Sequence, residues 1–262
     1  ASDVYKRQEY AYTNNDICDF VNGSWSPANP MSNIWSSSYK AIQICNQYLA
    51  EFQGLTFDEL KLNDDYRAQM FRYTNSFKEA RFLRAYFYFN LVRAYGDVPY
   101  FTEMVTTDQV NSLTRTPAQE IFNAIIAECD KLSTELPADY TKLGLDGIAP
   151  AENGRVTCYA ALALKARAAL YAASPLFNPG NNKDLWRRAA EANKEVIETC
   201  TANGFKLSKY SELWGPNNWS NNEMIFVRRY NGNISTLEEY NFPMGVPGGN
   251  SGNCPTQNMV DA

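Results

Sequence analysis

Residues 79–99 read EARFLRAYFYFNLVRAYGDVP and form an almost continuously apolar stretch. Two helical faces can be drawn on it, one through positions 82, 86, 89 and 93 and one through positions 83, 87, 91 and 94. Both faces are mostly apolar, and a helix of that kind is surrounded by other elements, so the stretch predicts a buried scaffold helix. Its end is predicted by Gly96, which permits a left-handed backbone, and by Pro99, at which a helix cannot resume.

Three arginines, Arg81, Arg84 and Arg93, accompany this apolar stretch. An unpaired charge inside a protein is costly, and the aliphatic stem of arginine can lie along apolar surface. We therefore expect these guanidinium groups to reach carboxylates or the carbonyls of helix ends.

Apolar side chains at three- and four-residue steps predict five helices in total. They span residues 32–52, 64–95, 117–135, 156–173 and 184–201. Asn63–Asp65 can cap the second of these helices, and Thr116-Pro117-Ala118-Gln119 predicts a capping box with proline at the first helical position of the third. The helix at 156–173 is rich in alanine, which lets a neighbouring helix come close.

The order of these segments predicts a mainly α fold with two parts. Residues 64–95 pair with 117–135, and residues 156–173 pair with 184–201 in the manner of a tetratricopeptide unit, although the spacing of the repeats is irregular. We expect a helical scaffold over residues 1–203. Residues 204–262 read as short irregular segments and loops rich in Gly, Pro and Asn, which we interpret as the start of a loop-rich ligand-binding portion.

Several side chains on helical faces are predicted to be core residues. Trp35, Trp186 and the hydrogen-bonded amide of Asn46 are interpreted in this way. So are three cysteines at helical spacing, Cys45, Cys129 and Cys200. The loop cysteines Cys18 and Cys254 leave a disulfide open, because connectivity cannot be read from a sequence.

The composition excludes several classes of function. The net charge of −5 argues against a nucleic-acid-binding surface. The chain contains no histidine, which removes Ser-His-Asp and Cys-His catalysis and histidine-ligated zinc. Adjacent carboxylates such as Asp64-Asp65 and Glu238-Glu239 stand in polar surroundings, where they are usually solvated or cap helices. We expect no catalytic residues, no metal and no cofactor.

Neither end of the sequence carries a membrane signal. No stretch approaches the roughly 18 apolar residues of a membrane span, and no signal peptide or lipid-attachment cysteine opens the chain. Both ends read as cuts, so we expect the sequence to be part of a longer protein.

The strongest functional signal is aromatic residues in Asn-rich loops. The C–H faces of sugar rings stack on tryptophan and tyrosine, while amides hydrogen-bond to sugar hydroxyls. Trp25 with Asn22 and Trp219 with Asn218 have this composition. We take these four residues and Tyr240 as candidate ligand contacts, against the alternative that the tryptophans anchor their loops in the core.

The motifs of the chain, in their order, resemble those of the SusD/RagB family of outer-membrane nutrient-binding lipoproteins. Residues 79–103 are similar to the family's signature helix, and five further segments match in order. They are the W-x3-Y-x2-I-x3-N pattern at 35–46, the R-x-P…LP segment at 115–137, GRVT and the alanine-rich helix at 154–173, the W…A…VI and E-x-I-F elements at 186–226, and P-T-x-x-x-V-D at 255–261. Members of the family are about twice as long, so the resemblance implies that a C-terminal half and an N-terminal lipid-attachment site are missing here.

The resemblance implies a non-catalytic protein that binds glycans at the cell surface. Its partner would be a SusC-like TonB-dependent transporter of the outer membrane, and its only membrane contact a lipid anchor outside this sequence. Phe82, Tyr86, Tyr95 and Gly96 carry over as fold determinants alone. The sequence does not name the sugar, because such families share a scaffold across many glycans.

Two other readings remain. A tetratricopeptide-type adaptor would bind a protein or peptide along an exposed helical face, although the irregular repeats and long aromatic loops count against it. A carbohydrate hydrolase would need two placed carboxylic acids with separated pKa values, and no such pair stands out.

Overall fold

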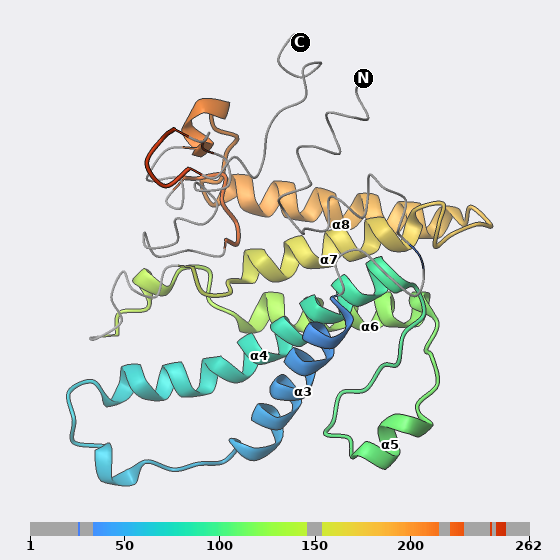
Figure 1. Cartoon of the computed structure of the whole chain (residues 1–262). Coiled ribbons are helices and arrows are strands. Elements are labelled where there is room, and N and C mark those ends of the chain that lie inside the picture. Colours follow the sequence, from blue (N-terminus) through green and yellow to red (C-terminus); the bar gives the residue numbers. More distant parts are fainter. Residues whose placement is uncertain are drawn as a thin grey trace. The chain divides into compact units, whose positions relative to one another are not determined.

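The computed structural model describes residues 26, 34–145, 154–214, 221–227, 242 and 245–249 (Figure 1). The chain divides into two compact units, one of residues 34–228 and one of residues 1–33 with 229–262. All helices in the described part belong to the first unit.

The first unit is helical, which confirms the predicted mainly α fold. Its helices are α3 (Trp35–Glu51), α4 (Tyr66–Tyr95), α5 (Thr107–Ser112), α6 (Ala118–Glu135), α7 (Cys158–Ala173) and α8 (Lys183–Ala202). Short 3-10 turns lie at η1 (Asp58–Leu60), η2 (Tyr140–Lys142) and η4 (Tyr210–Trp214). All five predicted helices are present, and α5 is an addition that the periodicity did not show.

Successive long helices pack side by side, α3 on α4, α4 on α6, α6 on α7 and α7 on α8 (Figure 1). This arrangement confirms the two predicted helix pairs. The division at residue 204 stays a prediction. Two rings of the segment after it pack on the scaffold, Phe205 on Tyr159 at 4.9 Å and Phe226 on Phe82 at 5.5 Å between centroids.

The predicted scaffold helix, α4, lies at the centre of the core. Phe82, Tyr88, Phe89 and Leu91 are buried together with residues of α3, α6 and α7. Burying a large apolar side chain stabilises a fold by about 1.5–3 kcal/mol, so this face accounts for much of the stability of the unit. The helix ends at Tyr95, and Gly96 takes a φ of +70°, as its position predicted.

The predicted capping box at the start of α6 is wrong. The N-cap residue is Pro117, and the first free backbone N–H, that of Ala118, donates to the carboxylate of Asp97 at 2.8 Å. The amide of Gln119 instead reaches across to α7 and donates to the carbonyls of Ala172 and Phe177. A cap from a distant part of the chain replaces the local one that the sequence pattern favoured.

The cap predicted for α4 is also only partly right. Asp65 occupies the N-cap position, but its side chain makes no capping hydrogen bond. Its carboxylate accepts from the side-chain amide of Gln69, one turn into the helix.

Of the predicted core residues, Asn46 and Trp35 behave as expected. Asn46 is buried, donates to the carbonyl of Glu103 at 2.9 Å and accepts from Arg84 at 2.8 Å. Trp35 packs against the core beside Tyr39 and Tyr95.

The core prediction for Trp186 is wrong. Its side chain is 37% exposed in the first turn of α8. The indole N–H reaches back to Asn181 in the preceding turn, at 3.1 Å, so the ring lies at the end of the helical layer and not inside it.

Cys45, Cys129 and Cys200 are buried free thiols, as predicted. Cys18 and Cys254 lie outside the described residues, so their pairing stays open.

Candidate ligand-binding site

The candidate ligand contacts from the sequence lie outside the residues that the structure describes. They are Asn22, Trp25, Asn218, Trp219 and Tyr240. Their role in binding therefore stays a prediction, and the described part of the chain offers two cavities to weigh beside them.

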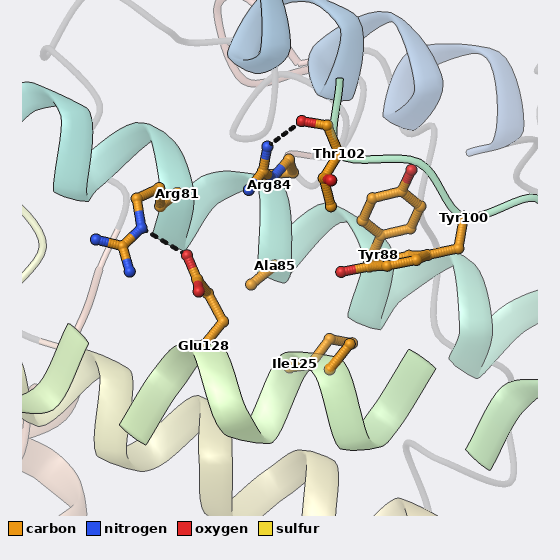
Figure 2. A pocket seen from close by; sticks show the side chains of 9 residues that line it. Arg81, Arg84, Ala85, Tyr88, Tyr100, Thr102, Ile125 and Glu128 are labelled. Atoms are coloured by element: carbon orange, nitrogen blue, oxygen red, sulfur yellow. Dashed lines mark hydrogen bonds and ion pairs between the residues drawn. The ribbon is translucent and has the colours of Figure 1, made fainter. Parts of the chain in front are cut away.

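The first cavity lies between α4, α6 and residues 100–102 and has a volume of about 250 Å³. We name it the α4–α6 cavity (Figure 2). Its lining residues are Arg81, Arg84, Ala85, Tyr88, Tyr100, Thr102, Ala124, Ile125 and Glu128. With two arginines, two tyrosines and a carboxylate, this set resembles the lining of a polar ligand site.

The two arginines of the α4–α6 cavity are held by the protein itself. Arg81 lies 2.6 Å from Glu128 and 2.6 Å from Glu135, both on α6. Arg84 donates to the carbonyl of Thr102 at 2.7 Å (Figure 2). It also donates to the side chain of Asn46 at 2.8 Å. The prediction that these guanidinium groups reach carboxylates or carbonyls is confirmed for both. The third arginine of the stretch, Arg93, is exposed and lies over the ring of Phe89.

The tyrosines of the α4–α6 cavity are likewise engaged. The hydroxyl of Tyr88 donates to the carbonyl of Phe101 at 2.7 Å and accepts from its N–H at 2.9 Å. The ring of Tyr88 packs on that of Tyr100, with centroids 4.6 Å apart. Burial raises the pKa of Tyr88 above its usual range, so the phenol stays neutral. The polar groups of the α4–α6 cavity therefore serve the scaffold, because they hold α3, α4 and α6 together.

A second cavity, of about 600 Å³, lies where α3 turns into α4. We name it the α4 N-terminal pocket. Its lining residues are Phe57, Leu60, Asn63, Asp65, Tyr66, Gln69, Met70, Arg72, Tyr73, Ser76 and Arg155. Most of these come from the first three turns of α4 and from the loop before it.

The residues of the α4 N-terminal pocket are not among the candidate contacts predicted from the sequence. A signal was present, because Tyr66, Met70 and Tyr73 share one face of α4 and the preceding loop carries Phe57 and Leu60. The sequence does not show that the loop before α4 lies far enough from this helix to leave a cavity between them.

A polar network anchors one wall of this pocket. The carboxylate of Glu79 accepts from Arg155 at 2.9 Å, from Asn75 at 2.6 Å and from the hydroxyl of Tyr140 at 3.1 Å. Arg155 precedes α7 and lines the pocket, so the network fixes it against α4.

The described residues contain no group of three or more His, Cys, Asp or Glu side chains that could hold a metal ion. None of the described helices is long and apolar enough to span a membrane.

Comparison with known proteins places the chain in a family. Residues 2–170 match a SusD-like family model described as starch-binding and associating with the outer membrane. SusD-like protein P2 from Formosa agariphila is 26% identical over 210 residues, which cover 79% of this chain and 35% of that protein. This chain therefore spans about a third of the length of that relative.

Solved structures give the same result. A SusD-like carbohydrate-binding protein from Bacteroides fragilis is 27% identical, with a TM-score of 0.59 over 81% of this chain and 36% of that one. A laminarin-binding SusD-like protein is 25% identical, with a TM-score of 0.57 over 80% of this chain and 40% of that one. The family model covers more than half of the sequence, and the helical scaffold agrees with it, so the chain belongs to the SusD-like family.

Proposed function

We propose that the protein to which this chain belongs binds an oligosaccharide or polysaccharide at the cell surface without transforming it. The observation that carries the proposal is the match of residues 2–170 to a family described as starch-binding. Two similar solved structures support it, one described as carbohydrate-binding and one as laminarin-binding.

Delivery of the glycan to a partner is the second part of the proposal. We infer a SusC-like TonB-dependent transporter of the outer membrane as this partner, and a lipid anchor outside this sequence as the link to the membrane. The association of the family with the outer membrane supports both. Binding without catalysis suits this role, because the transporter must receive the glycan intact.

Within this chain we propose the loop aromatics as glycan contacts. Trp25 and Trp219 would stack on sugar rings, with Asn22 and Asn218 bonding to hydroxyls beside them and Tyr240 as a further contact. The reason is the chemistry of these side chains, since amphipathic rings and amides together suit a ligand with apolar faces and a hydroxylated edge.

The test is a glycan panel against the full-length protein by affinity gel and calorimetry, with starch, laminarin and polysaccharides of other linkages. Trp25→Ala and Trp219→Ala are measured alongside. Trp186→Ala is the control, because this exposed tryptophan lies on α8 and is not one of the candidate contacts. A stacking ring contributes about 1–3 kcal/mol in nucleic-acid recognition, so loss of one should weaken binding about ten-fold or more.

Retention of one glycan that is recovered unchanged after long incubation supports the function. Binding that neither tryptophan affects leaves the function standing and removes these residues from the site. Failure of every glycan to bind counts against the function, and a screen for peptide ligands would then test the adaptor alternative.

A further inference from the structure

We propose that the α4 N-terminal pocket is a saccharide-binding site of its own, distinct from the loop tryptophans. The choice of a saccharide as the ligand rests on the proposed function. Its location rests on the geometry of the described residues alone, because every residue that lines this pocket belongs to the unit of residues 34–228.

One face of α4 supplies the apolar floor of this pocket. Tyr66, Met70 and Tyr73 follow one another at steps of four and three residues, so their side chains lie in a row along the helix. Phe57 and Leu60 line the pocket from the preceding loop. At about 600 Å³ the cavity falls within the roughly 300–1,000 Å³ that small-ligand sites usually occupy.

The loop that closes the pocket is fastened to α4 by Tyr73. The hydroxyl of Tyr73 donates to the carbonyl of Phe52 at 2.6 Å and accepts from the N–H of Leu55 at 3.0 Å. The ring of Phe57 then packs edge-on against that of Tyr73, with centroids 5.3 Å apart. Because the loop is held before any ligand arrives, binding would require little ordering of this wall.

Tyr66 is the ring best placed to stack on a sugar. It is half-buried in the first turn of α4. Within the described part of the chain, its side chain makes no hydrogen bond and its ring packs on no other aromatic ring. An amphipathic ring with an accessible face and a hydroxyl group matches the alternating apolar and polar surfaces of a pyranose.

Polar groups surround this apolar floor. Asn63, Asp65 and Gln69 line the pocket, and the side chains of Asp65 and Gln69 are hydrogen-bonded to each other. Ser76 is held by Tyr48 and by the carbonyl of Tyr73, and Arg155 is held by Glu79. A few oriented polar groups around an aromatic floor are what a hydroxylated ring ligand needs.

The loop beside the pocket also suggests a rival occupant. Leu62 is 97% exposed, and Leu55 and Leu60 are exposed as well, so a side chain of a partner protein could be taken instead. We favour the saccharide because, within the described residues, the ring of Tyr66 packs on no other aromatic ring and its hydroxyl makes no hydrogen bond. The side chains of Asn63, Asp65 and Gln69 place amide and carboxylate oxygens in the same lining.

The experiment observes the pocket directly through Met70. The full-length protein is labelled with ¹³C-methyl methionine, and the Met70 resonance is assigned from its loss in Met70→Leu. The retained glycan of the panel is titrated in. We expect the Met70 resonance to shift and saturate, because this side chain lines the pocket. The affinity read from Met70 should fall about ten-fold or more in Tyr66→Ala, since a stacking platform is removed.

Two variants control for loss of structure. Tyr66→Phe retains the ring and should stay within a few-fold of wild type. Leu62→Ala changes an exposed residue of the same loop that does not line the pocket and should leave the titration unchanged. Circular dichroism of each variant checks that α4 is folded.

The outcomes separate this inference from the proposed function. If a glycan is retained on the gel while Met70 does not move, or if Tyr66→Ala does not alter the Met70 titration, the pocket is not a saccharide site and the function stands. If Met70 responds only to a protein or peptide partner, the rival occupant is correct. If no glycan binds at all, the function fails and this inference fails with it.

Discussion

The carboxylate of Asp97 accepts a hydrogen bond from the backbone N–H of Ala118 at 2.8 Å, across 21 residues of sequence. Asp97 follows the end of α4, and Ala118 is the first residue of α6. Val98 and Thr116 form an isolated antiparallel bridge next to this contact. The residue that follows α4 therefore caps the start of α6. The segment between these two helices, which contains α5, begins and ends at this contact.

Removing this cap should destabilise the scaffold. We expect Asp97→Ala to lower the free energy of unfolding by about 0.5–2 kcal/mol, as for other helix caps, because the Ala118 N–H loses its partner. Asp97→Asn, which retains an acceptor oxygen, should cost less. Urea unfolding measures both. Asp108→Ala, at an exposed position of α5, is the matched control, and an equal loss there would contradict the assignment of a specific cap.

The ion pairs of Arg81 should be worth more than surface pairs. Arg81 and Glu128 have side chains only 24% and 20% exposed, whereas the side chains of Arg187 and Asp184 are 68% and 71% exposed at a similar separation. A double-mutant cycle on Arg81 and Glu128 should give a coupling of about 1–3 kcal/mol. The same cycle on Arg187 and Asp184 should give about 0–1 kcal/mol. Coupling energies of the same size would show that burial does not strengthen the ion pair between α4 and α6.

Stability should fall in alkaline solution because two buried phenols resist ionisation. Burial raises the pKa of Tyr88, and burial followed by the charge of Glu79 raises the pKa of Tyr140. In the unfolded chain both groups ionise near pH 10, so their contribution is complete below about pH 10 and is lost as the pH rises toward their folded pKa values.

Urea unfolding between pH 8 and 11 tests this sign. Tyr88→Phe should be less stable at pH 8, since it loses the hydrogen bonds to Phe101, but its stability should decline less steeply above pH 10. Tyr210→Phe, at an exposed position, should keep the slope of the wild-type protein. A wild-type slope in Tyr88→Phe would mean that another group sets the alkaline limit.

Cys129 should be the slowest of the described thiols to react. It is fully buried, and burial, assisted by the charges of Glu128 and Asp130, raises its pKa to about 12. Since the thiolate is the reactive form, alkylation at pH 8 should modify the half-buried Cys158 before Cys129. Peptide mapping by mass spectrometry after timed labelling measures the order. Equal rates in the native protein, and not only in urea, would contradict the burial of Cys129 in solution.

The sequence predicted α4 well because all the information is local. An apolar run from residue 82 to 95 with glycine and proline after it leaves few alternatives to a buried helix. The arginines could be predicted for a related reason, since the cost of an unpaired buried charge holds in any fold. The partners themselves could not be predicted, because the acids of Arg81 lie on α6 and the acceptors of Arg84 lie on α3 and at Thr102.

The error at the start of α6 arose where a distant residue competed with a local one. Thr116 and Gln119 have the spacing of a capping box, but Asp97 and the carbonyls of Ala172 and Phe177 offered better partners from elsewhere in the fold. The α4 N-terminal pocket could not be predicted either, because it depends on how the loop before α4, which Tyr73 holds, lies against the helix. The loop tryptophans remain a prediction from composition.

Ten of the 16 residues of α7 are buried, and seven of these are alanines. The helix lies between α6 and α8, so the small side chains set how closely three layers approach. Any larger side chain there would wedge the layers apart at a typical cost of about 1–3 kcal/mol. The turns at the ends of the helices are under no such restriction, and surface loops accept changes of length cheaply. A lineage built on this scaffold can therefore vary the length and sequence of its loops while the spacing of its helices stays unchanged.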